Sequence, residues 1–280
     1  MGDCSTMNLQ APDNSAFRTW FRDCLKGGTG RNVEWPMLMR RVLFEELQRL
    51  RISDQFYKGE VFLNRDDKVN EHRHRDSQDE EVLVYQLYAA VHEQTQGELR
   101  IDGTPIWLFS CEVPNQGKEL SNRTKKRRAD LVGLRQDGSL VVFECKGPHN
   151  SKDSPLFSVL EGMDYLGCLL TENNVTRLNQ GLQDWISQQR PQALGDNRFS
   201  SAVPDWPSFA IDPLAKHGVI VLAPQTYFDL HINDANGRSQ DWWLLSNRFA
   251  SSINSALDLD LDFATVDFGQ GSADLLKLPT

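Results

Sequence analysis

The sequence of 280 residues has no apolar run long enough to span a membrane, and no basic-then-apolar stretch opens it. Its five cysteines are scattered and odd in number, and no pair has the spacing of a zinc finger or a redox motif. These absences argue against membrane-spanning and disulfide-scaffold classes and predict a reduced cytoplasmic protein. The chain is long enough for one large α/β domain with additions or for two small domains.

Two further signatures are missing. A Gly-rich loop ending in Lys-Ser or Lys-Thr is absent, which argues against a nucleoside-triphosphatase of that type. No helix-turn-helix or zinc finger is visible, so the sequence predicts no sequence-specific recognition module. The net charge is -9, whereas nucleic-acid-binding domains usually run basic.

The middle of the chain contains two apolar runs, residues 131–134 and 140–143. They are joined at Asp137-Gly138, a dipeptide that accepts the positive φ of a tight hairpin turn. The sequence therefore predicts two buried strands in a hairpin over residues 129–146.

Three charged residues mark one end of this hairpin: Asp130, Glu144 and Lys146. Side chains alternate along a strand, so Glu144 and Lys146 share a face, and the hairpin brings Asp130 to the same end. A buried charge is costly unless it is paired or coordinates a metal. Asp130 and Glu144 are therefore candidate ligands of Mg²⁺ or Mn²⁺, with Lys146 orienting or deprotonating a metal-bound water. The alternative is a surface ion pair between Glu144 and Lys146, but the preceding aspartate and the apolar strands favour the site.

Asp130, followed by Glu144-x-Lys146 at the end of the next strand, resembles the motif of the PD-(D/E)xK nuclease superfamily, which has the restriction-endonuclease-like fold. Ala129 stands where the name-giving pattern has proline. The resemblance implies a metal-dependent phosphodiesterase, with the backbone carbonyl of Cys145 as a further metal ligand. The thiol of Cys145 is expected on the opposite strand face, in the core.

Two predicted helices flank the motif. Residues 79–95 form a helix with an acidic first turn, and the resemblance implies a further metal ligand there, best matched by Glu81. Acidic residues at this position also simply complement the helix dipole. Residues 155–170 form an amphipathic helix in which Glu161 and Tyr165 share a face. They resemble the Q-x-x-x-Y motif of the exonuclease-type branch, with Glu161 in place of glutamine, and a surface glutamate and a helix-edge tyrosine are the alternative.

The predicted elements follow one another as in the αβββαβ core of that superfamily: helix 79–95, strand 105–113, hairpin 129–146, helix 155–170 and strand 217–223. The fold class expected is therefore α/β, with a mixed central sheet flanked by helices. We expect a helical N-terminal extension over 1–78, a nuclease-like core over 79–224, and a C-terminal extension packed on the core over 225–280.

The C-terminal part carries two patterns. Thr226 to Ile232 is expected to extend the sheet. Asp258, Asp260 and Asp262 alternate with apolar residues, which indicates an acidic edge strand or tail. The pattern lacks the glycine and the final glutamate of a calcium loop.

The function expected from the resemblance is hydrolysis of phosphodiester bonds, with DNA as the commoner substrate and RNA as the other. Cleavage within a strand and cleavage from an end both suit these residues, and so does a homodimer. A basic run precedes Asp130 and either holds a phosphate backbone or forms a solvated loop: Arg123, Lys125, Lys126, Arg127 and Arg128. The alternative function is a catalytically inactive nucleic-acid-binding or protein-interaction module on the same fold.

Overall fold

A computed structural model describes part of the compact unit formed by residues 54–280. The described residues are 77–114, 128–151, 153, 155–170, 172–187, 210–232, 259–268 and 272–276. The predicted N-terminal helices and the basic residues before Arg128 lie outside this part of the chain. In the described ranges, no helix combines the length and the apolar character needed to cross a membrane.

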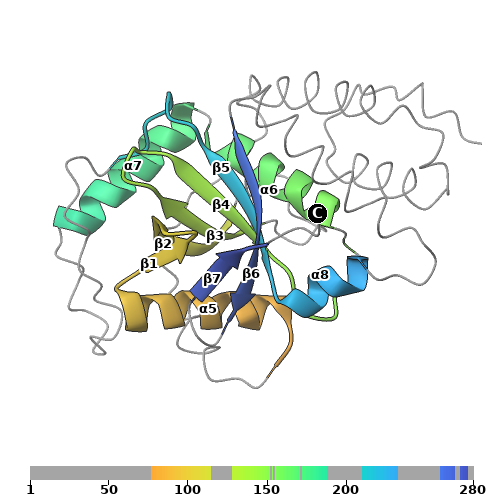
Figure 1. Ribbon diagram of the computed structural model, residues 1–280. Helices are drawn as coiled ribbons and strands as arrows, with labels where there is room; N and C mark the ends of the chain where they lie inside the picture. Colours follow the sequence, from red (N-terminus) through yellow and green to blue (C-terminus); the bar gives the residue numbers. More distant parts are fainter. Residues whose placement is uncertain are drawn as a thin grey trace, which may run out of the picture. The chain divides into compact units, whose positions relative to one another are not determined.

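The described residues form one mixed seven-stranded sheet with helices packed on it (Figure 1). Their order is α5 (Glu80–Thr95), β1 (Glu98–Ile101), β2 (Thr104–Pro114), β3 (Arg128–Leu134), β4 (Leu140–Cys145), α6 (Pro155–Leu169), α7 (Glu172–Ser187), β5 (Gly218–Ala223), α8 (Gln225–Ile232), β6 (Asp260–Asp267) and β7 (Ser272–Leu275). The strands lie side by side in chain order. β1 to β4 are antiparallel neighbours, β4, β5 and β6 are parallel, and β7 is antiparallel to β6. The predicted α/β class with a mixed sheet is confirmed.

The central hairpin forms where the sequence predicts it. Leu131 lies opposite Phe143, and Leu134 lies opposite Leu140. At the turn, Gly138 has φ of 84°, a value that favours glycine because it has no Cβ. The Gly138 N–H donates to the carbonyl of Arg135 at 3.0 Å, which closes the turn. The register that results places residues 130 and 144 at the same end of the hairpin.

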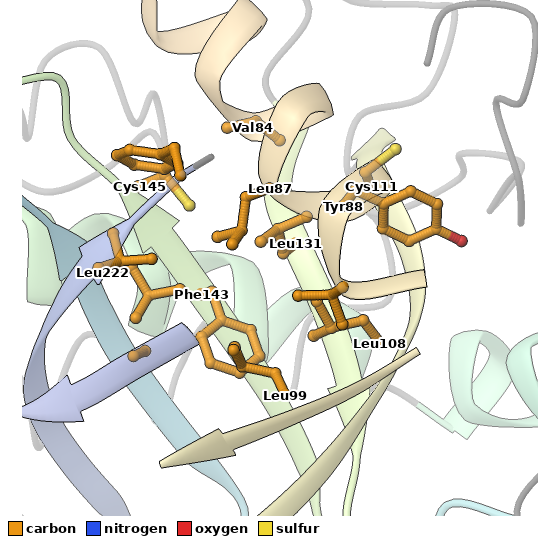
Figure 2. Packing of buried hydrophobic residues seen from close by; sticks show 14 of the residues in the cluster. Val84, Leu87, Tyr88, Leu99, Leu108, Cys111, Leu131, Phe143, Cys145 and Leu222 are labelled. Carbon is orange, nitrogen blue, oxygen red and sulfur yellow. The ribbon is translucent and has the colours of Figure 1, made fainter. Parts of the chain in front are cut away.

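One face of the sheet packs against α5 and forms the main core (Figure 2). Every second residue of the strands points to this face, and α5 packs aliphatic and aromatic side chains against it. From α5 come Val84, Leu87 and Tyr88, and from the strands come Leu99, Leu108, Cys111, Leu131, Phe143, Cys145 and Leu222. Cys145 is a free, fully buried thiol in this core, as its place between Glu144 and Lys146 predicts. The side chains between these positions, including that of Glu144, must therefore point to the other face.

The other face is covered by α6, which packs against β4 and β5. The helix lies close to the sheet at Gly162, where a Cβ atom would lie 2.4 Å from Cγ1 of Val219. α6 and α7 connect β4 to its parallel neighbour β5, the type of connection that parallel strands require. The glycine thus sets how near the α6 side chains lie to the charged end of β4.

Two segments differ from the sequence-based expectation. The expected strand over 226–232 is wrong, because these residues form α8, whose first turn includes a hydrogen bond from the Tyr227 amide to the Pro224 carbonyl at 2.9 Å. Tyr227 and Phe228 are fully buried there. β6 is a strand, as the alternation of Asp260 and Asp262 indicates, but it lies between β5 and β7 and is not at the edge.

Glycine to alanine substitutions in α6 test the close approach of the helix to the sheet. Gly162→Ala should destabilise the fold by about 1–3 kcal/mol, because the added methyl group overlaps Val219. Gly167→Ala is the matched control, since nothing lies within 4 Å of its Cβ position, and its higher helix propensity should stabilise by about 0.5–1 kcal/mol. Denaturant unfolding measures both changes, and similar effects from the two substitutions would contradict the close approach.

Candidate active site

Asp130 and Glu144 lie side by side at the end of the central hairpin. Because Leu131 pairs with Phe143, the next residues in the register, Asp130 and Glu144, lie opposite each other. Their side chains project from the face that α6 covers, and Glu144 is almost completely buried. One oxygen of Asp130, Oδ2, accepts the backbone N–H of Cys145 at 2.7 Å. The sequence-based placement of these two carboxylates at one end of the sheet is therefore confirmed.

Lys146 lies directly after β4 and continues its pairing with β5, since its amide donates to the carbonyl of Leu222 at 2.8 Å. Its side chain projects from the same face as that of Glu144. The Nζ atom donates to Oε1 of Glu144 at 2.7 Å, and both side chains are about 5% exposed or less. This is a buried ion pair and not a surface one.

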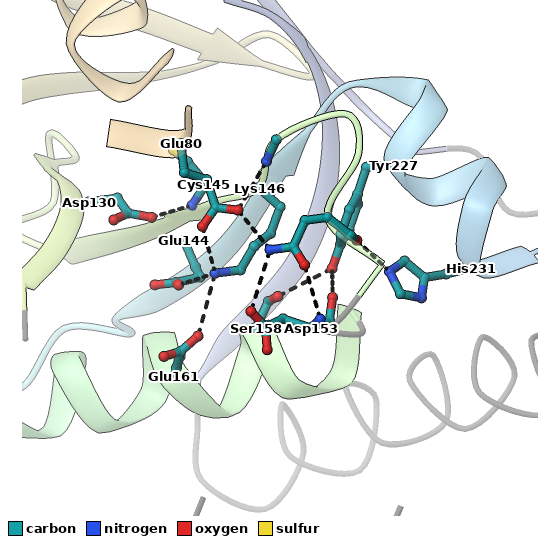
Figure 3. Close-up of polar contacts among 12 residues, drawn as sticks. Glu80, Asp130, Glu144, Cys145, Lys146, Asp153, Ser158, Glu161, Tyr227 and His231 are labelled. Atoms are coloured by element: carbon teal, nitrogen blue, oxygen red, sulfur yellow. Dashed lines mark hydrogen bonds and ion pairs between the residues drawn. The ribbon is translucent and has the colours of Figure 1, made fainter. Parts of the chain in front are cut away.

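Two more carboxylates surround the Lys146 ammonium group (Figure 3). Glu161, from α6, places Oε2 at 3.4 Å from Nζ, and Glu80, from the first turn of α5, places Oε1 at 3.6 Å. Glu161 is also buried, whereas Glu80 is partly exposed. We call Glu80, Asp130, Glu144 and Glu161, together with Lys146, the carboxylate cluster.

The carboxylate cluster has more negative than positive charge. Burial raises the pKa of Glu144 and of Asp130 well above the ordinary carboxyl range, although Lys146 acts in the opposite direction. Burial lowers the pKa of Lys146, but Glu144 and Glu161 outweigh this and raise it well above its ordinary value. Oε2 of Glu144 is buried and accepts no hydrogen bond from the described residues. The cluster therefore suits one more positive charge, which a proton or a metal cation supplies.

The loop after Lys146 is fixed from two sides. Oε2 of Glu80 accepts hydrogen bonds from the Gly147 amide at 3.2 Å and from Nδ2 of Asn150 at 2.8 Å. From the other side, Nε2 of His231 donates to the carbonyl of Asn150 at 3.2 Å, and the Tyr227 hydroxyl donates to the carbonyl of Asp153 at 2.8 Å. Both α5 and α8 thus hold the segment that follows the cluster.

The helix carboxylate in the cluster is Glu80, whereas the sequence favoured Glu81. The Glu81 side chain is 55% exposed, and its Oε1 lies 4.0 Å from Nη1 of Arg128. That guanidinium donates to Oε2 of Glu112 at 3.0 Å, so the one described residue of the basic run is held by carboxylates. Glu112 is buried and has φ of 51°, which a non-glycine residue rarely adopts.

Tyr165 is buried on α6, one turn after Glu161. Tyr227, from α8, bonds the loop after Lys146, and its hydroxyl also lies 3.3 Å from the Ser158 hydroxyl. Sequence reasoning missed Glu80, Asn150 and Tyr227. Only Glu80 had a signal, because it shares the acidic first turn of α5 with Glu81.

Asp130 and Glu144 offer carboxylate oxygens, the ligand type that Mg²⁺ prefers. Asp130 Oδ1 and Glu144 Oε2 take no hydrogen bond from the described residues, so each carboxylate keeps one oxygen available. Mg²⁺ commonly binds one or two carboxylates and keeps several waters. Across the described ranges, no group of three or more His, Cys, Asp or Glu side chains is placed to hold a metal ion.

Comparisons with known proteins found no relative of this chain. No family model, no curated protein and no solved structure matches the chain.

Replacing Lys146 tests whether its ammonium group compensates the buried carboxylates. Lys146→Met should destabilise the protein by about 3–5 kcal/mol at pH 8, because it leaves buried charge unpaired. The loss should be smaller at pH 5. A carboxyl with a raised pKa in the folded state binds more protons folded than unfolded, so stability falls as pH rises from the ordinary carboxyl range towards the raised pKa. Lysine itself stays protonated throughout this interval.

Lys216→Met is the matched control for that experiment. Lys216 pairs with Asp260 at 2.7 Å, at the opposite end of β5. Burial raises the pKa of Asp260, but hydrogen bonds from Lys216 and Arg135 outweigh this and lower it, so Asp260 is ionised at both pH values. Chemical denaturation at pH 5 and pH 8 measures the free energy of unfolding of both variants. An equal loss of stability at pH 5 and pH 8 in Lys146→Met would show that protonation of the carboxylates does not relieve the loss, and no loss at either pH would show that the carboxylates do not depend on Lys146.

Proposed function

We propose that this chain is a metal-dependent nuclease with a restriction-endonuclease-like core. The observation that carries the proposal is the buried Lys146 ammonium group beside Glu144, with Asp130 directly across the hairpin. The order α5, β2, β3, β4, α6, β5 supports it, because three antiparallel strands are followed by a helical connection to a parallel strand. This is the order that the resemblance to the PD-(D/E)xK superfamily implies.

Asp130 and Glu144 would hold Mg²⁺ or Mn²⁺, as the resemblance also implies. When bound, such a cation activates water and neutralises charge on a phosphate group. Lys146, with its raised pKa, is an ammonium group and a hydrogen-bond donor at neutral pH. Lys146 can therefore orient the attacking water and stabilise negative charge, but a protonated amine cannot accept a proton from that water.

DNA is the proposed substrate class, on the resemblance and on the basic run that leads to β3. Within that run, Arg128 enters the sheet beside Glu112 and Glu81, so its charge is already partly compensated. Contact with a phosphate backbone would then fall mainly to Arg123, Lys125, Lys126 and Arg127, which precede the described part of β3.

A second candidate function is an inactive binding module on the same fold. The 2.7 Å contact favours it, because Lys146 already compensates part of the charge of Glu144 without a metal. The two functions differ in their response to cations. A ligand that binds only the folded state must raise its stability, so Mg²⁺ should raise the melting temperature of a nuclease but not of a module without a metal site.

Cleavage assays with matched variants test the nuclease. Linear and circular DNA, and RNA, are incubated with the protein in Mg²⁺, in Mn²⁺ and in EDTA. We expect cation-dependent cleavage that falls by about 100-fold or more in Lys146→Met and in Asp130→Asn, because each removes a charged group at the reacting phosphate. The controls Lys216→Met and Asp274→Asn change the same residue types outside the carboxylate cluster and should keep the wild-type rate.

The comparison of circular with linear DNA distinguishes internal from terminal cleavage. A wild-type protein that cleaves none of these substrates would contradict the nuclease and favour the binding module. Cleavage that persists in both cluster variants would contradict the assignment of the active site.

A further inference from the structure

The Lys146 ammonium group has partners on different elements. Glu144 comes from β4, at 2.7 Å, and Glu161 comes from α6, at 3.4 Å. Glu80, at 3.6 Å, is partly exposed, and its Oε2 already bonds the loop after Lys146. Glu161 is therefore the second buried carboxylate that contacts Lys146.

A cation on Glu144 creates a conflict with Lys146. Lys146 already donates to Oε1 of Glu144 at 2.7 Å, and a cation on the same carboxylate would repel the ammonium group. Oε2 of Glu144 is buried and unpartnered among the described residues, so this oxygen can accept an additional positive charge. If Lys146 then had no other buried partner, its ammonium group would be left unpaired, which is strongly unfavourable.

The position of Glu161 is fixed by the packing of α6. At the next residue, Gly162, the helix backbone lies close against Val219 of β5, with no room for a Cβ atom. β5 in turn pairs with β4, and the carbonyl of Leu222 accepts the Lys146 amide at 2.8 Å. The Glu161 backbone is thus held at a set distance from the strand that bears Glu144.

We propose that Glu161 is a positioning residue that holds the Lys146 ammonium group when a divalent cation binds Glu144. The inference rests on the proposed function, because it presupposes a cation at Asp130 and Glu144. In the absence of the cation, Lys146 lies against Glu144. With the cation bound, Lys146 is retained beside the site by Glu161, charged and able to donate a hydrogen bond. A glutamine at residue 161 lacks the negative charge for this role.

Mn²⁺ binding in a double-mutant cycle tests the role of Glu161. The dissociation constant is measured by electron paramagnetic resonance in the wild type, Glu161→Gln, Lys146→Gln and the double variant. Glu161→Gln should weaken Mn²⁺ binding by about tenfold in the wild-type background, but by less than about twofold with Lys146→Gln, since interacting residues are not additive. Glutamine at residue 146 is neutral and its side-chain amide is a hydrogen-bond donor, which favours a folded protein.

Control variants separate this effect from a general change of charge. Glu172→Gln, in the exposed first turn of α7, removes the same charge and should leave Mn²⁺ affinity unchanged. Circular dichroism checks the fold of each variant. If Lys146→Gln does not fold, Lys146→Arg provides the second background: it keeps the charge, so the full effect of Glu161→Gln should remain.

The outcomes distinguish failure of this inference from failure of the proposed function. A wild-type protein that binds no Mn²⁺ overturns both. Mn²⁺ binding that Asp130→Asn weakens, but Glu161→Gln does not, overturns the role of Glu161 alone. An equal effect of Glu161→Gln with and without the lysine would show that Glu161 acts through its own charge, which also overturns its role as a positioning residue. In the Lys146→Arg background, loss of the effect would do the same.

Discussion

The charges buried at the end of β4 must be compensated, and the elements around them are arranged to do so. Glu144 and Lys146 are both almost fully buried and contact each other, although an isolated buried charge costs far more than a surface one. The pair alone does not neutralise the charge of the cluster, because Glu80, Asp130 and Glu161 add three further carboxylates. A site with such an excess of negative charge is suited to take up a cation or to hold protons.

The fold brings these groups together from distant parts of the chain. The hairpin places Asp130 across from Glu144, and the pairing of β4 with β5 fixes the backbone of Lys146. The α5 and α6 helices then add one carboxylate each from opposite faces of the sheet. The acidic residues in the first turn of α5 complement the helix dipole, and one of them, Glu80, also reaches the charged end of the sheet.

The sequence predicted those parts of the site that depend on local pattern. The alternation of side-chain direction along a strand, together with the turn at Asp137-Gly138, was sufficient to place Asp130, Glu144 and Lys146 on one face. Two adjacent glutamates start α5, and which of them reaches Lys146 depends on the rotation of the helix against the sheet, a tertiary property. Glu80 and not Glu81 makes that contact for this reason.

Tertiary packing also explains where the sequence-based expectations failed. Residues 226–232 are rich in side chains that favour strands, yet burial of Tyr227 and Phe228 stabilises α8 there. The alternation of aspartates with apolar residues in β6 suggested an edge strand. Asp260 is paired with Arg135 and Lys216, however, so its charge is compensated although the strand lies inside the sheet. The local sequence around Asp260 could not predict its partner Arg135, which is more than a hundred residues away in the chain.

Anomalous diffraction from crystals of the protein grown or soaked with Mn²⁺ tests the cation site directly. We expect an anomalous peak between the carboxylates of Asp130 and Glu144, with Lys146 still inside the site. A structure with bound Mn²⁺ elsewhere and none between these two carboxylates would contradict it.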